Sequence, residues 1–175
     1  MARPGLRLGL DQWQSSWMID TTLFDASARV PVVVDASVDV AATPREVFDA
    51  WTTSEGLRAW LGIESRVDLR IGGAYEWIFL ADAPAGAQGS EGCQVLAYVP
   101  DELLAFSWNA PPEIPFARSR RAWCVLTLAP LATGTRVRLR HLGLGEEGDW
   151  SAVGPYFARA WPSVMSRLSA HFGAH

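Results

Sequence analysis

One histidine stands where acid–base chemistry could be done, at the end of an alternating run near residue 140. In "RVRLRHLGL" (136–144), three arginines alternate with apolar residues until His141 ends the pattern. Alternation of this kind is typical of a half-buried strand, and it places His141 on the inner face with Val137 and Leu139. Three interpretations remain open: a hydrogen-bonded core residue, a polar contact to a ligand, or a general base.

A catalytic histidine would need a carboxylate or a nucleophile on the same inner face. The strand patterns instead place Asp35, Asp39, Asp68 and Glu76 on outer faces. The sequence has no HxxH or HExxH spacing and no Ser–His–Asp order with supporting context. We therefore expect no metal, no cofactor and no catalytic residue.

The arginines of the same run have a structural explanation. If the first and last strands are neighbours, Arg136, Arg138 and Arg140 share an outer face with Asp35 and Asp39. Opposite charges on adjacent strands contribute roughly 0.2–1 kcal/mol per pair. We favour this pairing over the alternative, a surface that binds an anionic partner.

Composition excludes several classes of protein. The chain has 175 residues, enough for one domain, with a formal net charge of −4 and a pI near 5.3. This charge disfavours nucleic-acid binding. The basic residues are all arginine, which excludes a P-loop or Schiff-base lysine and is typical of GC-rich bacterial genomes. Cys93 and Cys124 lie on strands two positions apart, about 9.6 Å, so we expect free thiols.

The remaining elements follow from periodicity and turn signals. A strand is predicted at 32–40, followed by two short helices in "TPREVFDAW" and "TSEGLRAWLG". Thr43, Pro44 and Glu46 form a capping box for the first helix, and Ser54 and Gly62 bound the second. Six further strands are predicted, at 65–73, 74–81, 93–99, 103–110, 121–129 and 135–142.

A long amphipathic helix is predicted from Asp149 to Phe172, because apolar residues recur there every three or four positions. Pro155 and Pro162 fall inside it, and Pro162 predicts a kink or break. Residues 1–29 form an N-terminal extension with a short helix at most, and 30–175 form a single domain. No span of 18 apolar residues and no signal peptide are evident, which predicts a cytoplasmic protein without membrane insertion.

These elements, in this order, resemble the family of activators of the 90-kDa heat-shock-protein ATPase (homologue 1-like), within the START/polyketide-cyclase (SRPBCC) superfamily. The matching stretches span roughly residues 32–172; they are "ATPREVFDAWTTSEGLRAWLG", "IGGAYEW", "VPDELLAFSW", "LAPLATGTRVRLRHLGL" and "AWPSVMSRLSAHF". The resemblance implies an α+β helix-grip fold, in which a curved seven-stranded antiparallel sheet wraps around the C-terminal helix. The two short helices lie between the first and second strands.

The resemblance also implies a cavity between sheet and helix for an apolar or aromatic, lipid- or polyketide-like molecule. Strand and helix parity supplies the residues expected to line it. These ligand-binding candidates are Tyr75, Trp77, Phe79, Phe106, Trp108, His141, Phe157 and Trp161.

Three functions remain open. The first is binding of a small molecule in this cavity. The second is a polyketide cyclase- or aromatase-like enzyme without metal or nucleotide cofactor, in which Tyr75 or His141 moves protons. The third is a protein-interaction module that engages a chaperone, as the eukaryotic activators do. The sequence also leaves a homodimer open.

Overall fold

The structure, a computed structural model, describes residues 32–173. The predicted extension over residues 1–29 lies outside the described residues. The elements are, in chain order, β1 (Val32–Val40), α2 (Pro44–Thr52), α3 (Ser54–Leu61), β2 (Glu64–Val67), β3 (Tyr75–Ile78), β4 (Val95–Val99), β5 (Leu103–Trp108), α4 (Pro115–Arg118), β6 (Ala122–Leu131), β7 (Gly134–Leu142), the 3-10 helix η2 (Trp150–Ala152) and α5 (Val153–Phe172). The predicted α+β class is confirmed.

The strands form a five-stranded antiparallel sheet in the order β1-β7-β6-β5-β4 and a separate β2–β3 pair. The prediction was one sheet of seven strands. The pair stays attached through a bridge between Ala74 and Gln94 and through the Tyr75 N–H, which donates to the Cys93 carbonyl at 2.8 Å. The predicted strand 65–73 ends early because turn hydrogen bonds from Arg70 to Asp68 and from Gly73 to Arg70 close over its second half.

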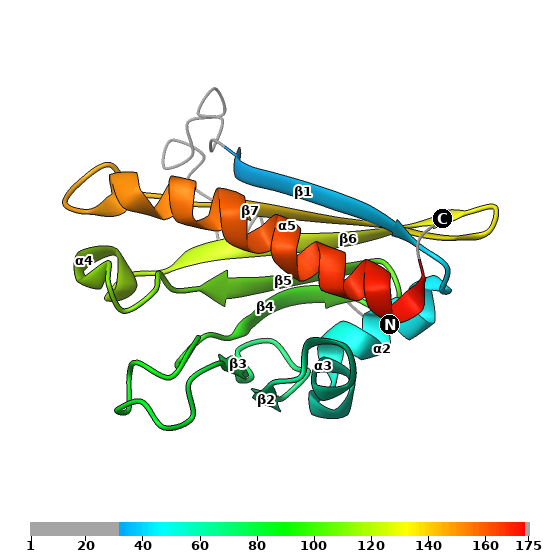
Figure 1. Cartoon of the computed structure of the whole chain (residues 1–175), viewed down its shortest axis with the longest axis horizontal. Coiled ribbons are helices and arrows are strands. Elements are labelled where there is room, and N and C mark those ends of the chain that lie inside the picture. Colours follow the sequence, from blue (N-terminus) through cyan, green and yellow to red (C-terminus); the bar gives the residue numbers. More distant parts are fainter. Residues whose placement is uncertain (1–31, 174–175) are drawn as a thin grey trace, which may run out of the picture. The chain divides into compact units, whose positions relative to one another are not determined.

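Helix α5 lies along one face of the sheet as a single ribbon (Figure 1). Its buried residues recur at helical spacing; they are Val153, Phe157, Trp161, Met165 and Leu168. The predicted break at Pro162 is absent. Pro162 and Ala158 are both exposed, so water can solvate the carbonyl that the proline leaves without a donor. No helix in the described range is long and apolar enough to cross a membrane.

Helices α2 and α3 close one end of the domain, beside the C-terminal part of α5 (Figure 1). The predicted capping box is present: the Thr43 hydroxyl accepts from the Glu46 N–H, and the Glu46 carboxylate accepts from the Thr43 N–H. The cap of α3 is Thr53, one residue before the predicted Ser54. Gly62 ends this helix in a left-handed conformation at φ 72°, as a C-cap glycine should.

The first and last strands are neighbours, so the condition for the expected charge pairs is met, and two of the three arginines form such pairs. Asp39 lies opposite Arg136 and receives two hydrogen bonds from its guanidinium, at 2.8 and 2.7 Å. Arg138 reaches diagonally to Asp35, with an Nε–Oδ1 distance of 2.8 Å. These contacts lower the pKa of Asp35, chiefly through the Arg138 hydrogen bond. Cross-strand pairing therefore explains Arg136 and Arg138, whereas the Nε of Arg140 is buried without a hydrogen-bond partner among the described residues.

Candidate functional site

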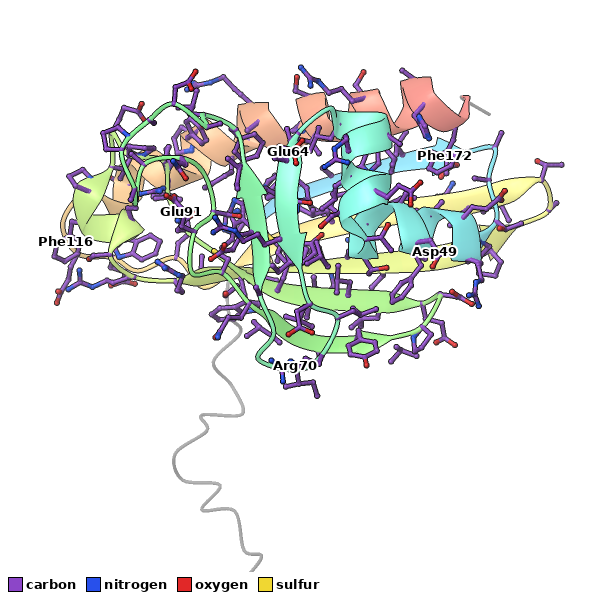
Figure 2. The ribbon with its side chains drawn as sticks, turned by 90° about the horizontal axis from the view of Figure 1, so that it is seen from below. Asp49, Glu64, Arg70, Glu91, Phe116 and Phe172 are labelled. Atoms are coloured by element: carbon purple, nitrogen blue, oxygen red, sulfur yellow. The ribbon has the colours of Figure 1, made fainter. Side chains whose placement is uncertain are left out.

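A cavity of about 360 Å³ lies at the end of the domain opposite α2 and α3. Its walls are the end of β3, the end of β5 and the first half of α5, and its rim is made by the two loops 79–90 and 109–118. Figure 2 shows that end of the domain, where Glu91 and Phe116 lie, with Phe172 at the other end of α5. The volume falls within the roughly 300–1,000 Å³ of sites that hold drug-sized ligands.

Three tryptophans form the deep wall. The ring centroids of Trp77 and Trp108 are 5.1 Å apart in an edge-to-face arrangement, and those of Trp108 and Trp161 are 5.4 Å apart. Trp77 lies on the inner face of β3, Trp108 ends β5, and Trp161 lies on α5 one turn beyond Phe157. Strand alternation and helical spacing therefore bring aromatic side chains from three elements to one surface.

The mouth of the cavity is apolar and open to solvent. Phe79 is 49% exposed, Leu80 58% and Tyr156 40%, and all three line the cavity. Large apolar side chains this exposed are uncommon as a group, and a cluster beside a cavity indicates a contact surface.

Several polar atoms of the deep cavity wall make no hydrogen bond within the described residues. Asn109 is 6% exposed, and its amide N–H donates to the Gly89 carbonyl at 3.3 Å, which leaves its Oδ1 without a donor. The indole N–H of Trp77 is fully buried without an acceptor, and the indole N–H of Trp108, a residue 4% exposed, makes no hydrogen bond within the described residues either. A ligand in the cavity can therefore meet one donor and one acceptor on adjacent residues.

The two rim loops are joined by an ion pair. The Arg118 guanidinium lies 3.0 Å from the Glu91 carboxylate, and both side chains are largely buried. Burial raises the pKa of Glu91, but hydrogen bonds from the backbone N–H groups of Gln88, Gly89 and Gly86 outweigh it, so that pKa lies below its usual value. The carboxylate thus connects the backbone of loop 86–91 to Arg118.

Arg118 is placed by a short helix that is itself anchored. The Asp149 carboxylate accepts from the backbone N–H groups of Phe116 and Ala117, at 3.1 and 2.8 Å, and so ties α4 to the start of η2. Gly89 lines the cavity so close to the Trp77 carbonyl that a Cβ at this position would collide with that oxygen. Specific contacts therefore fix both rim segments, the loop that contains Gly89 and the helix α4.

Of the eight residues expected to line the cavity, five do so and three do not. Those on its wall are Trp77, Phe79, Trp108, Phe157 and Trp161. Tyr75, Phe106 and His141 are fully buried in the core instead. The Tyr75 hydroxyl donates to the Trp51 carbonyl at 2.8 Å, because α2 and α3 pack over that part of the sheet and fill it.

His141 lies behind the aromatic wall. Its Nδ1 accepts a hydrogen bond from the Trp161 indole N–H at 3.1 Å, and its ring meets the edge of Phe157 with centroids 4.5 Å apart. The neutral ring must then carry its proton on Nε2, which has no partner within the described residues. Burial lowers the pKa of His141 to about 4.

Neither residue named for proton transfer is suited to it. Burial raises the pKa of Tyr75 well above its ordinary value. His141 is neutral at pH 7 but has no access to the cavity. The described residues also contain no group of three or more His, Cys, Asp or Glu arranged to hold a metal.

Both cysteines are free, as predicted, and both are buried. Burial raises the pKa of Cys93 to about 11 and that of Cys124 well above its usual value. Since the thiolate is the nucleophile, neither thiol is activated.

Strand and helix parity missed the rim residues, because most of them lie in loops or in the short helix α4, and Tyr156 lies on the exposed side of α5. These additional cavity-lining residues include Leu80, Gln88, Asn109, Glu113, Arg118 and Tyr156. Two composition signals did mark the loops: the Gly-rich "PAGAQGSEG" and the Pro-rich "APPEIPF". Loops held by a rigid scaffold are where binding residues concentrate.

An antiparallel sheet that grips one long C-terminal helix is the helix-grip fold. The sequence profile described as "Activator of Hsp90 ATPase homolog 1-like protein" matches residues 41–173. The chain belongs to this family. No curated protein matches the sequence.

Solved structures share the fold at low sequence identity. The solution structure of the Aha1 dimer from Colwellia psychrerythraea is similar with a TM-score of 0.60 and 18% identity, over 80% of this chain and 96% of that one. CalU16 from Micromonospora echinospora gives 0.58 and 22%, over 79% and 74%. DynU16, a protein of the dynemicin biosynthetic locus, gives 0.58 and 19%, over 79% of this chain and only 46% of that one.

Proposed function

We propose that this protein binds an apolar, aromatic small molecule in the cavity between the sheet and α5. The observation that carries the proposal is the aromatic wall of Trp77, Trp108 and Trp161 around about 360 Å³ of space. A wall of this kind offers large apolar contact area, and the Trp108 N–H and Asn109 Oδ1 offer orientation.

Binding is better supported than catalysis. A cyclase would need a proton donor or acceptor at the cavity surface, and the two candidates, Tyr75 and His141, lie behind it. The polar groups beside the aromatic wall, the Trp108 indole and the Asn109 amide, do not titrate near neutral pH, and the Glu113 carboxylate lies at the exposed rim.

The proposal is tested by native mass spectrometry of the purified protein, followed by a thermal-shift screen of lipids and aromatic polyketides. A ligand present at about 100 times its Kd stabilises the folded state by roughly 2.7 kcal/mol, and so raises the Tm by roughly 5–10 °C. A bound small molecule, or a concentration-dependent rise in Tm, is the expected result.

A cavity-filling variant separates this site from others. Ala160 lines the cavity from α5, so Ala160→Phe should abolish the ligand's thermal shift. Ser166→Phe, on the exposed face of the same helix, is the control and should retain it. If both variants respond like the parent protein, the ligand binds elsewhere and the proposal is wrong.

The family description favours a second candidate, an interaction with a chaperone ATPase, and the relative solved as a dimer favours self-association. The first predicts that the protein accelerates ATP hydrolysis by a 90-kDa heat-shock protein even when Ala160→Phe fills the cavity. The second predicts a dimer mass in sedimentation experiments. Cavity binding requires neither result.

A further inference from the structure

We propose that the ligand of this cavity is an apolar molecule that carries a protonated amine, and that the site discriminates against carboxylates and phosphates. This inference rests on the proposed function, since it names the charge of the molecule that the cavity takes. It comes from the charged groups of the rim and from the aromatic faces beside them.

The positive charge at the cavity is already neutralised. Arg118 donates from Nε to the Gly86 carbonyl at 2.8 Å, from one terminal nitrogen to the Ala110 carbonyl at 2.6 Å, and from the other to Gly89 and to the Glu91 carboxylate. Its side chain is only 13% exposed. An anionic ligand would have to displace these bonds to reach the guanidinium.

The negative charge at the cavity is not neutralised. Glu113, in the loop between β5 and α4, is the one other charged residue among the described residues of the lining. Its side chain is exposed, and its carboxylate forms no hydrogen bond or ion pair with any residue of the described range. The rim therefore presents a net negative charge to a ligand, and this favours a cation.

The aromatic wall favours the same sign of charge. The faces of Trp and Phe rings carry partial negative charge and attract an ammonium group within about 6 Å, by roughly 0.5–2 kcal/mol. Phe79 and Tyr156 are exposed at the mouth, where Glu113 also lies, and Trp77 and Trp108 lie deeper. An ammonium group at the mouth would have an aromatic face and a carboxylate within one site.

The unpartnered acceptor in the wall, Asn109 Oδ1, also favours an amine over an anion. Asn109 Oδ1 can accept a hydrogen bond from an N–H group, whereas it repels the lone pairs of a carboxylate. The indole N–H groups of Trp77 and Trp108 are then the unpartnered indole donors that the described wall offers an anion, and no free positive charge lies beside them among the lining residues. The geometry thus separates amines and neutral molecules from anions.

A matched set of probes tests the sign of the charge. 1-Naphthylmethylamine, 1-naphthalenemethanol and 1-naphthoate share one ring system and carry a positive, a zero and a negative charge at pH 7. Isothermal titration calorimetry should give the tightest binding for the amine, by about 2- to 10-fold over the alcohol, and the weakest for the naphthoate. Added salt should reduce the preference for the amine.

Two variants locate the charge that matters. Glu113→Gln should weaken binding of the amine about 2- to 5-fold and leave binding of the alcohol unchanged. Glu102→Gln is the control, because Glu102 is exposed in the turn between β4 and β5, outside the cavity. It should change neither affinity.

The outcomes separate this inference from the proposed function. If the alcohol binds but the naphthoate equals or exceeds the amine, the charge assignment is wrong and the aromatic site stands. The same conclusion follows if Glu113→Gln does not weaken binding of the amine. If neither the alcohol nor the amine binds, the proposed aromatic site fails, and the charge assignment fails with it.

Discussion

The indole N–H of Trp161 donates a hydrogen bond to Nδ1 of His141 over 3.1 Å and so joins α5 to β7 behind the cavity. One face of the tryptophan lines the cavity while its polar edge is satisfied in the core. The same bond selects the tautomer of His141, since the acceptor nitrogen cannot carry the proton. The histidine for which the sequence left a core, a ligand-binding and a catalytic role open therefore positions a wall residue.

Burial of this histidine predicts a pH dependence of stability. The pKa of His141 is lowered from 6.5 to about 4, so the unfolded chain takes up a proton in this interval and the folded chain does not. The free energy of unfolding should therefore decrease as the pH falls from about 6.5 to 4, by on the order of 3 kcal/mol in total. Urea unfolding at a series of pH values measures this slope.

Two variants assign that slope. His141→Phe removes the titrating group and should flatten the curve in this interval, although the unpaired Trp161 N–H lowers stability at every pH by about 1–3 kcal/mol. His171→Gln, at the exposed end of α5, should leave the slope unchanged. Equal slopes in His141→Phe and the parent would show that another group takes up the proton.

The Glu91 carboxylate should control the motion of the cavity rim. In Glu91→Gln the amides of Gly86, Gln88 and Gly89 lose a charged acceptor, and Arg118 loses its ion pair. We expect faster hydrogen exchange at these amides and a loss of about 1–3 kcal/mol in stability.

The matched control for the rim is Glu113→Gln, in which a carboxylate without such hydrogen bonds is neutralised. Exchange at residues 86–91 should be the same in this variant as in the parent. Protection that survives Glu91→Gln would mean that the backbone turn alone holds the loop.

The outer charge pairs should contribute little. Asp35→Asn breaks the contact with Arg138. Because the side chains of Asp35 and Arg138 are 39% and 51% exposed, we expect the free energy of unfolding to fall by only about 0.2–1 kcal/mol, and by less at high salt. Because the pKa of Asp35 is lowered, its contribution is present above the unfolded pKa and lost as the pH falls. Ser37→Ala on the same face is the reference, and chemical denaturation in low and high salt compares the two.

The buried thiols should be inert in the folded protein. A disulfide exchange reagent at pH 8 should react with neither Cys93 nor Cys124 until the chain is denatured, and then with both. Rapid reaction under native conditions would contradict the burial of these side chains.

Local periodicity was enough for most of the fold. Alternation in the run that contains Arg136 and Arg138 marked a strand, and the capping box at Thr43 and Glu46 marked the start of a helix. These signals are local: each depends on residues two to four positions apart. The strand predicted at 65–73 was too long because alternation cannot register that Gly73 closes a turn on Arg70.

The site depended on the tertiary structure. The alternation of side chains along the strands correctly predicted that Trp77 and Trp108 face inward. It could not distinguish these cavity-lining residues from Tyr75, which also faces inward but is covered by α2 and α3. Whether an inward side chain meets a cavity or a packed helix depends on how neighbouring elements fill space, and that is a property of many long-range contacts together.

The sequence by itself determined the class of fold and the aromatic character of the interior. Only the tertiary structure decided that His141 lies behind Trp161, and that Arg118 is neutralised by Glu91 while Glu113 is not. Hydrogen-bond partners tens of residues apart are chosen by packing, whereas strand and helix propensities are set within a few residues. The net charge at the cavity rim, and the set of side chains that a ligand in the cavity can reach, follow from that packing.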